Sequence, residues 1–488
     1  MRLEIAFLRG MALISDRDRT AHLLRRFGLG ASEAEVEYYG AGGWRNAVDR
    51  LLACESIDEP VRYTEEFLKD QEGRMPPNPI QTQTMLYAWL LTTNRPLQAK
   101  MTVFWHDHFA TSSEKVSNGP AMYKHWNTLW EGALGKFEDL LLSVSKDPAM
   151  LYWLDNIENV RGRANENFAR EVMELFTLGV DHYTEEDIQE AARAFTGWSY
   201  GFQFNTNSRV LPNRGQVPRL NSVYVLDERS HDNEEKTFFG KKANWNGDGI
   251  IKELCGMSRT AFYLTEKMWE FFAYAKPEKS LIEKHATAFL RSGLDIKVAL
   301  RGIMMDEEFY SSKAERTIVK NPIDFCIPTM RQLGVGASLA PAIKDYTHTS
   351  GITTRARLLV ARETHKSTEA MGMALLLPPD VAGWPTQLQW VSTATMVERI
   401  KWSEKVFGGR GTSLVTVPVI APIGATSREV VSKMLSVFDA RLPQEKVDTL
   451  VAGADRILNG GRVSRTNGSQ VAVEVAKLLF STPEFQFM

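Results

Sequence analysis

The sequence predicts an all-α protein: a large multi-helix domain interrupted by one small β excursion. Through most of the 488 residues, apolar side chains recur at helical spacing, in short segments separated by Pro, Gly and Asp. Between residues 198 and 246 this pattern gives way to alternating aromatics, Tyr200, Phe202 and Phe204, followed by SVYVLD and turn-rich polar residues. That stretch is typical of a small β-hairpin or an ordered loop.

Composition shifts divide the chain into four parts. An N-terminal segment, residues 1–17, precedes the main helical domain, residues 18–407, which contains the 198–246 excursion. Residues 408–426 are rich in Gly, Pro and Val and predict a linker or extended arm, and residues 427–488 predict a small C-terminal helical end piece.

The predicted helices begin and end at capping signals. Ser32 followed by Glu35 forms a capping box, Gly179 is a predicted C-cap, Thr184 is a predicted N-cap, and Asn321 precedes a proline that opens a helix. The helical segments of the first part are expected over residues 22–30, 32–40, 44–55, 79–93, 95–109, 121–134, 165–179 and 184–198. Helices are expected to resume near residue 247 and to continue to about residue 407.

Charge and hydropathy exclude two classes of partner. The 58 basic and 60 acidic side chains give a formal charge of -2, so neither nucleic acid nor an anionic membrane surface is indicated. No stretch approaches the roughly 20 consecutive apolar residues that a membrane-spanning helix needs.

The cysteines and the N-terminus predict a cytoplasmic protein. Cys54, Cys255 and Cys326 are few and far apart, which is typical neither of a disulfide framework nor of a thiolate zinc site. Glu4 and Arg9 interrupt what would have to be the apolar core of a signal peptide.

Standard catalytic motifs are missing from the sequence. It contains no GxxxxGK[ST], GxGxxG, GxSxG or HExxH motif and no EF-hand loop, so nucleotide-binding, serine-hydrolase and zincin functions lose support.

The stretch FWHDHF, residues 104–109, contains the only close pair of histidines. His106 and His108 would point about 200° apart on a regular helix, so they can share one ion only if the helix ends or distorts there. The following ATSSEKVSNGP predicts such an end, and Asp107 or a distant carboxylate would complete the ligand set. The alternative is that one histidine caps the helix and the other is a hydrogen-bonded core residue.

The helix NENFAREVMELFTLG, residues 165–179, carries a second polar cluster. Glu166, Arg170 and Glu174 stack at four-residue intervals opposite the apolar face, which is typical of a solvated ladder. Glu171 lies between the ladder and the apolar face, where a carboxylate needs a cation, a donor or a metal. The sequence lacks the ExxH repeat of di-iron bundles.

Two non-helical segments add candidates. His231 and Asp232 lie within the β excursion. They could act as metal ligands or as a general base, or they could simply form a turn. LLLPPDVAGWPTQLQW, which contains Trp384, predicts a rigid aromatic loop that lines a pocket or seals the edge of a core.

Several segments, in this order, resemble the bacterial domain-of-unknown-function family 1800. They are HLLRRFGLGAS, MTVFWHDHFATSSEKV, DPAMLYWLD, NENFAREVMELFTLGVDHYTEEDIQEAARAFTGW, HDNEEKTFFG, VKNPIDF and PPDVAGWP, and they cover roughly residues 18–405. The resemblance implies a large, mainly helical domain without an established activity. It marks His22, His106, His108, Glu166, Arg170, Glu171, Glu174, Thr177, Gly179, Trp198, His231, Asp232 and Trp384. Two departures from the family are expected. Relatives commonly carry an export signal, which this N-terminus is not expected to form, and MGMALLLPPD stands where relatives carry Gly-Gln before the two prolines.

The leading functional hypothesis is a metalloenzyme, an oxidoreductase more than a hydrolase. His106 and His108 would hold a transition metal with Glu171 or Glu166, iron or manganese being favoured over zinc or copper. The expected catalytic residues are Arg170, Glu174, His231 and Asp232, and the expected walls of the cofactor pocket are Trp105, Trp198 and Trp384. The substrate would be a small molecule or peptide. Rival hypotheses are a metal-dependent hydrolase, a haem protein and a non-catalytic helical scaffold that binds a protein partner.

Overall fold

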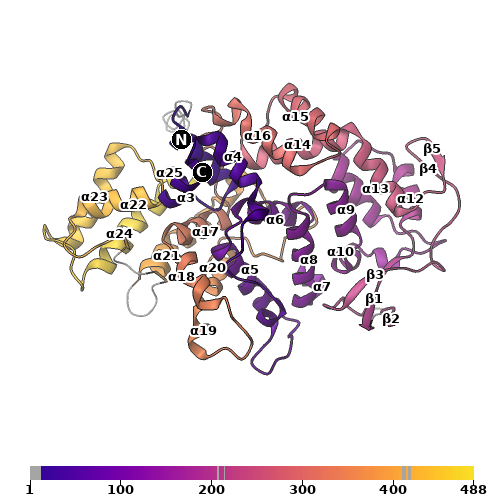
Figure 1. Ribbon diagram of the computed structural model, residues 1–488, viewed down its shortest axis with the longest axis horizontal. Helices are drawn as coiled ribbons and strands as arrows, with labels where there is room; N and C mark the ends of the chain where they lie inside the picture. The colour runs from indigo at the N-terminus through magenta and orange to yellow at the C-terminus, as the bar shows by residue number, and fades with distance from the viewer. Residues whose placement is uncertain (1–12, 206–207, 214, 409–413, 416–418) are drawn as a thin grey trace.

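The computed structural model describes residues 13–205, 208–213, 215–408, 414–415 and 419–488. The chain forms an elongated, mainly helical molecule, which confirms the predicted fold class (Figure 1). Most of the predicted N-terminal segment and much of the predicted linker, residues 1–12, 409–413 and 416–418, lie outside the described residues.

The helices follow the predicted segments closely. Those before the strands are α2 (Asp16–Phe27), α3 (Glu33–Gly40), α4 (Trp44–Leu52), α5 (Ile80–Thr92), α6 (Pro96–His108), α7 (Ser113–Val116), α8 (Gly119–Gly132), α9 (Phe137–Ser145), α10 (Pro148–Trp153), α11 (Asn167–Met173) and α12 (Glu185–Ala194). Those after the strands are α13 (Gly247–Gly256), α14 (Ser258–Phe272), α15 (Lys279–Arg291), α16 (Ile296–Met305), α17 (Pro322–Gln332), α18 (Val335–Ile343), α19 (Ile352–Arg357), α20 (Leu359–Ala370), α21 (Thr393–Phe407), α22 (Ser427–Val437), α23 (Gln444–Leu458), α24 (Gly468–Ser481) and α25 (Pro483–Gln486).

Short turns of other helix types complete the helical part. The 3-10 turns are η1 (Cys54–Ser56), η2 (Glu65–Leu68), η3 (Asn156–Glu158), η5 (Glu307–Tyr310) and η6 (Gln387–Trp390). The element η4 (Glu174–Leu178) is a π-helical turn that continues α11.

The capping residues lie where the sequence predicts them. Ser32 and Glu35 form the expected capping box, and Thr184 forms a second one with Asp187. Gly179 follows η4 at a φ of 79°, a conformation that favours glycine, and Asn321 caps α17.

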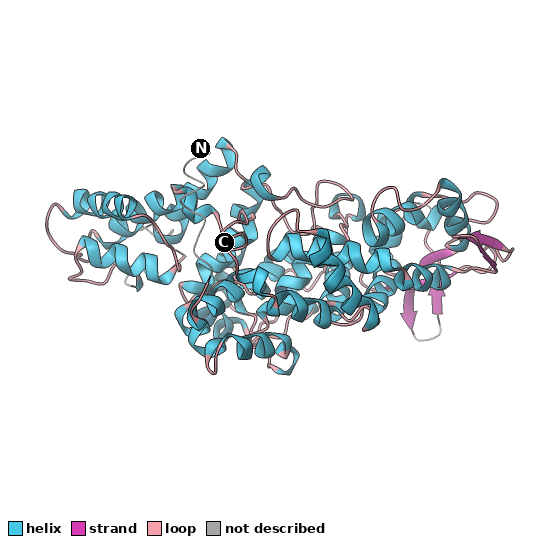
Figure 2. Ribbon diagram, turned by 90° about the horizontal axis from the view of Figure 1, so that it is seen from above, coloured by secondary structure: helices cyan, strands magenta, loops and turns pink. Residues whose placement is uncertain are grey.

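The predicted β excursion forms two small antiparallel sheets. In the first, β1 (Trp198–Asn205) lies between β2 (Ser208–Val210) and β3 (Ser222–Leu226), with Tyr200 opposite Tyr224. The second pairs β4 (Lys236–Phe238) with β5 (Lys241–Ala243). Both sheets lie at one end of the long axis, opposite the C-terminal helices (Figure 2).

Helix α6 lies between two hydrophobic cores. Met101, Phe104 and Trp105 pack into one core, and Ala99 and Val103 pack into the other. A helix that is surrounded in this way must be apolar on nearly all sides. Every residue of α6 except Asp107 is buried.

The C-terminal end piece shares its core with the main domain. Phe480 of α24 packs edge-on against Phe325 of α17, with ring centroids 5.5 Å apart, and both belong to the same buried cluster as Trp402 of α21. Arg25 of α2 also forms an ion pair with Asp439, which follows α22. The end piece is therefore fixed to the main domain by both apolar and charged contacts.

The helices in the described part of the chain include none with the length and apolar content that crossing a membrane requires.

Candidate functional site

The two histidines of FWHDHF point to opposite sides of α6. The Nε2 atom of His106 accepts a hydrogen bond from the backbone N–H of Leu376 at 2.9 Å, and its ring lies against Trp126 and Trp384. The Nε2 atom of His108 donates to the carbonyl of Phe176 at 3.2 Å, within the other core. The helix does end at His108, as expected, but it stays regular to that point, so the imidazoles diverge.

Both imidazoles are held neutral by burial. Desolvation lowers the pKa of His106 to about 3, with a further contribution from the nearby His125. Burial also lowers the pKa of His108 well below its ordinary value. The carbonyls at the end of the π-helical turn lack partners within the helix, so side chains from elsewhere donate to them. His108 donates to Phe176, Tyr263 donates to Leu175, and Arg259 donates to Leu178.

The acidic helix presents a solvated ladder. Arg170 forms two hydrogen bonds with Glu185, at 2.9 and 2.8 Å, and a longer one with Glu166 at 3.3 Å. The side chains of Arg170 and Glu166 are 34% and 38% exposed. The ladder interpretation therefore holds for Glu166 and Arg170, and Arg170 takes Glu185 instead of Glu174 as its second carboxylate partner.

The two remaining carboxylates of this helix lie beside the ladder. Glu171 is partly buried, and desolvation together with the charge of Glu174 raises its pKa. Glu174 accepts a hydrogen bond from the hydroxyl of Tyr183. Each therefore sits in a local environment of its own and not in a shared site with the histidines.

The structure does not bring the four expected metal ligands together. His106 and His108 are separated by the body of α6, and Glu166 and Glu171 contact neither of them. Within the described ranges, no three His, Cys, Asp or Glu side chains form a group that could hold an ion. The metal-dependent oxidoreductase and hydrolase hypotheses, and the haem alternative, stay predictions from the sequence.

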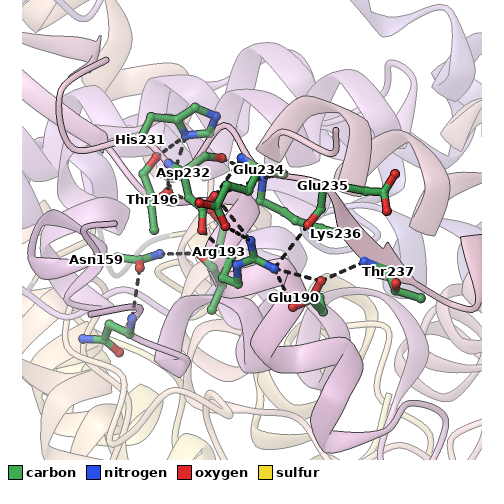
Figure 3. A network of polar contacts seen from close by, with 12 residues as sticks. Asn159, Glu190, Arg193, Thr196, His231, Asp232, Glu234, Glu235, Lys236 and Thr237 are labelled. Atoms are coloured by element: carbon green, nitrogen blue, oxygen red, sulfur yellow. Dashed lines mark hydrogen bonds and ion pairs between the residues drawn. The ribbon is translucent and has the colours of Figure 1, made fainter. Parts of the chain in front are cut away.

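His231 and Asp232 belong to a polar network that fastens the β excursion to α12 (Figure 3). His231 Nδ1 donates to the carbonyl of Thr196 at 2.7 Å, and Asp232 accepts from Arg193 Nε at 2.8 Å. The buried Lys236 ammonium donates to the carbonyls of Asp232 and Glu234, at 2.6 and 2.9 Å. The pattern matches the turn interpretation, and among the residues that the structure describes no hydrogen bond or ion pair joins this network to His106 or His108.

The three expected tryptophans do not wall one pocket. Trp105 is fully buried and donates its indole N–H to the carbonyl of Ala133 at 3.0 Å. Trp198 lies on β1 with the ammonium of Lys146 5.2 Å from its ring centroid. Trp384 alone lies next to FWHDHF, where it covers His106 and borders a cavity.

That cavity, which we call the Asp107 cavity, is the candidate site. It has a volume of about 170 Å³. It is lined by Val103, Phe104, Asp107, Lys267, Glu270, Phe271, Ala275, Ile318, Val319, Asn321, Asp324, Met373, Trp384, Pro385, Thr386, Gln387, Trp390 and Met488. Three of the segments that resemble the family, FWHDHF, VKNPIDF and PPDVAGWP, meet there although they are far apart in the chain.

Helix periodicity explains why α6 and α14 supply the charged groups of the cavity. On α6, Lys100, Val103, Phe104 and Asp107 follow the spacing of one helix face, and on α14, Tyr263, Lys267, Glu270 and Phe271 do the same. Both faces border the cavity, so α6 contributes an aspartate to it and α14 contributes a lysine and a glutamate.

Asp107 is held by the aromatic loop. Its Oδ1 atom accepts a hydrogen bond from the backbone N–H of Trp384 at 2.7 Å. A Cβ atom on Gly383 would lie 2.3 Å from the same oxygen, and Gly383 has a φ of 92°. Both facts require glycine at position 383, so the loop conformation and the carboxylate position depend on each other.

The environment of Asp107 favours its protonated form more than water does. Burial raises the pKa of Asp107 to about 6, and the Trp384 N–H and the charge of Lys267 offset part of this effect. Burial likewise lowers the pKa of Lys267, although Asp107 and Glu270 act in the opposite direction. Next to them, Lys100 forms a buried ion pair with Asp324.

Sequence reasoning named Asp107 only as an additional ligand and missed Lys267, Glu270 and Asp324. A usable signal existed, because Lys100 and Asp107 are the only charged residues of α6 besides its histidines and lie seven residues apart on one face. No such signal existed for Lys267, because α14 carries several charged residues and only packing decides which of them faces inward.

Two larger hollows on the surface carry weaker chemistry. One, of about 520 Å³, lies between α5 and α18, but its Glu35 and Arg331 are paired with each other at 3.1 Å. Another, of about 370 Å³, adjoins Trp198, and Asp227 at its edge accepts a hydrogen bond from the Ser230 hydroxyl at 2.6 Å. The charged residues Glu35, Arg331 and Asp227 are thus already partnered within the protein.

Comparison with known proteins agrees with the resemblance seen in the sequence. Searches of curated proteins and of solved structures each gave no match. A family model described as "Protein of unknown function (DUF1800)" matches residues 22–487, so it extends through the C-terminal helices beyond the segments in which the resemblance was recognised. The chain therefore belongs to the DUF1800 family, and the Asp107 cavity lies within the part that the family shares.

Proposed function

We propose that the chain is an enzyme that transfers protons to and from a small organic molecule bound in the Asp107 cavity. The observation that carries this proposal is the position of Asp107. It is the one residue of the central helix α6 that is only partly buried, and it faces a cavity built from segments on both sides of that helix.

The surroundings of Asp107 suit general acid–base catalysis. A catalytic acid or base works best when its pKa lies near the pH at which it operates, and burial brings the pKa of Asp107 to about 6. Trp384 fixes Oδ1, while Oδ2 forms no hydrogen bond with any residue that the structure describes. The free oxygen is therefore available to a ligand.

The cavity walls favour a small ligand with an apolar part. Phe104, Phe271, Trp384 and Trp390 supply aromatic surface, and Asn321 supplies an amide. A volume of about 170 Å³ is close to the roughly 150 Å³ of an engineered cavity that accommodates benzene, so the part of the ligand inside is about the size of one ring.

Two measurements test the proposal together. Crystals soaked with a library of small carbonyl compounds, acids and alcohols should show density next to Asp107. The same compounds, incubated with the protein in D₂O, should gain deuterium at exchangeable C–H positions. Asp107→Asn should abolish the exchange, while Asp181→Asn, the same change at an exposed position, should not alter it.

The outcomes separate this function from the alternatives. Binding without exchange would indicate a binding protein and support the scaffold hypothesis. Absence of both binding and exchange would refute the proposed site.

A further inference from the structure

Lys267 is an unusual lysine because it borders the Asp107 cavity without an ionic partner. Its ammonium nitrogen lies 5.4 Å from the ring centroid of Tyr263. In the described part of the chain, Lys267 forms no ion pair and no hydrogen bond, although Asp107 and Glu270 lie close enough to influence its charge. A lysine amine in such a place has no fixed contact to break before it meets a ligand.

Lys100 provides a comparison within the same region. Its ammonium also lies near an aromatic ring, 5.3 Å from the centroid of Phe271, but it is paired with the buried carboxylate of Asp324. Pairing is the usual way in which a protein stabilises a buried ammonium. The fold therefore pairs the charge of Lys100 directly, whereas Lys267 has no ion pair and only the influence of the nearby Asp107 and Glu270.

The lack of support changes the chemistry of Lys267. Desolvation lowers its pKa, so a larger fraction of the side chain is the uncharged amine at neutral pH. An uncharged lysine in an apolar pocket is an activated nucleophile toward carbonyl carbons.

We propose that Lys267 is a nucleophilic amine and that the ligand of the Asp107 cavity is a small aldehyde or ketone, with which Lys267 forms an imine. This inference rests on the proposed function and names its substrate class. Three facts support it: Lys267 faces the cavity, it lacks an ionic partner, and Asp107 lies across the same space.

The residues present account for every atom of the reaction. The Lys267 nitrogen lone pair attacks the carbonyl carbon, the C=O π bond breaks, and a proton passes from nitrogen to oxygen to give a carbinolamine. Asp107 then donates a proton to the hydroxyl group, the C–O bond breaks, water leaves, and the nitrogen keeps its one remaining proton as an iminium. Asp107, now a carboxylate, is placed to accept a proton from the carbon next to the iminium, which is the proton transfer of the proposed function.

Reductive trapping tests the inference on the full chain. The protein is incubated with propanal or benzaldehyde and sodium cyanoborohydride, which reduces an imine to a stable secondary amine, and peptide mass spectrometry then measures the labelling of each lysine. Lys267 should be labelled at least about ten times faster than the exposed Lys252, because burial favours the uncharged, nucleophilic amine of Lys267. Lys267→Arg should remove the fast label and leave that of Lys252 unchanged.

The controls distinguish the two proposals. Equal labelling of Lys267 and Lys252, with carbonyl compounds visible in the cavity of soaked crystals, would overturn the imine and leave the proposed function intact. An empty cavity together with equal labelling would overturn both. Asp107→Asn should slow the labelling of Lys267 several-fold. An unchanged rate in that variant would assign the water-loss step to another acid. Circular dichroism spectra of all variants establish that they are folded.

Discussion

Replacing Asp107 with asparagine should make the protein more stable at neutral pH, and the gain should grow with pH. Asparagine keeps the oxygen that accepts from the Trp384 N–H, so the loop contact survives. It removes the carboxylate, whose ionised form is penalised by burial. The charged groups around this site are Lys267 and Glu270 from α14 and the Lys100–Asp324 pair.

The magnitude follows from the raised pKa. A carboxyl group with a pKa of about 6 in the folded state and 3.8 as its ordinary value is protonated in both states at low pH. Its effect on stability therefore appears as pH rises from about 4 to about 6, and ionisation then costs the folded state about 3 kcal/mol. At about pH 4.5 roughly 1 kcal/mol of this cost is present, so the advantage of Asp107→Asn should grow by about 2 kcal/mol between pH 4.5 and pH 8.

Urea unfolding at these two pH values measures the difference. The midpoints of wild type, Asp107→Asn and the exposed control Asp181→Asn are compared at each pH, with the slopes checked for equality. The control should follow wild type at both values. A gap between Asp107→Asn and wild type that stays constant with pH, or that shrinks as pH rises, would refute the reasoning about the buried carboxylate.

Four further predictions concern the framework of the site. Gly383→Ala should lower the free energy of unfolding by about 2–4 kcal/mol, measured by thermal or urea unfolding, because the new Cβ would collide with Asp107. Gly460 also has a positive φ but lies in open space, so the control Gly460→Ala should lower it by only about 1 kcal/mol. Asp324→Asn should lower the free energy of unfolding by about 3–5 kcal/mol, because it leaves the buried Lys100 unpaired. The double change Lys100→Met with Asp324→Leu should restore most of that free energy. Equal losses in the single and the double variant would contradict this prediction. His106→Gln and His108→Gln should each lower the free energy of unfolding, and the loss in the double variant should equal the sum of the two single losses within about 0.5 kcal/mol. Neither change should alter the metal content of the protein, measured by mass spectrometry. A metal that is lost in both variants would support the shared metal site. Asp232→Asn should be less stable than wild type at neutral pH, and this difference should shrink as pH falls, because the ion pair with Arg193 lowers the pKa of Asp232. Ligand binding in the Asp107 cavity should be unaffected.

The carboxylates of the acidic helix show how far sequence reasoning reaches in this protein. Four-residue spacing predicts a ladder of Glu166, Arg170 and Glu174; the structure pairs Arg170 with Glu166 and with Glu185, while Glu174 bonds Tyr183. Periodicity also requires His106 and His108 to diverge on a regular helix, and they do. The expected convergence depended on a distortion at the helix end that the structure does not contain.

The sequence by itself determined the local structure: the helices and their caps, the β excursion after Trp198, and membership of the family. The helices, caps and strands depend on residues within a few positions of one another, through apolar spacing, capping and turn chemistry, and family membership depends on such segments following in order. The site depends on tertiary structure, because Asp107, Lys267, Asp324 and Trp384 come from four segments that only packing brings together. Burial then gives the carboxyl and amine groups chemical properties that their residue types alone do not have, since the free energy of a charge depends on whether water can reach it.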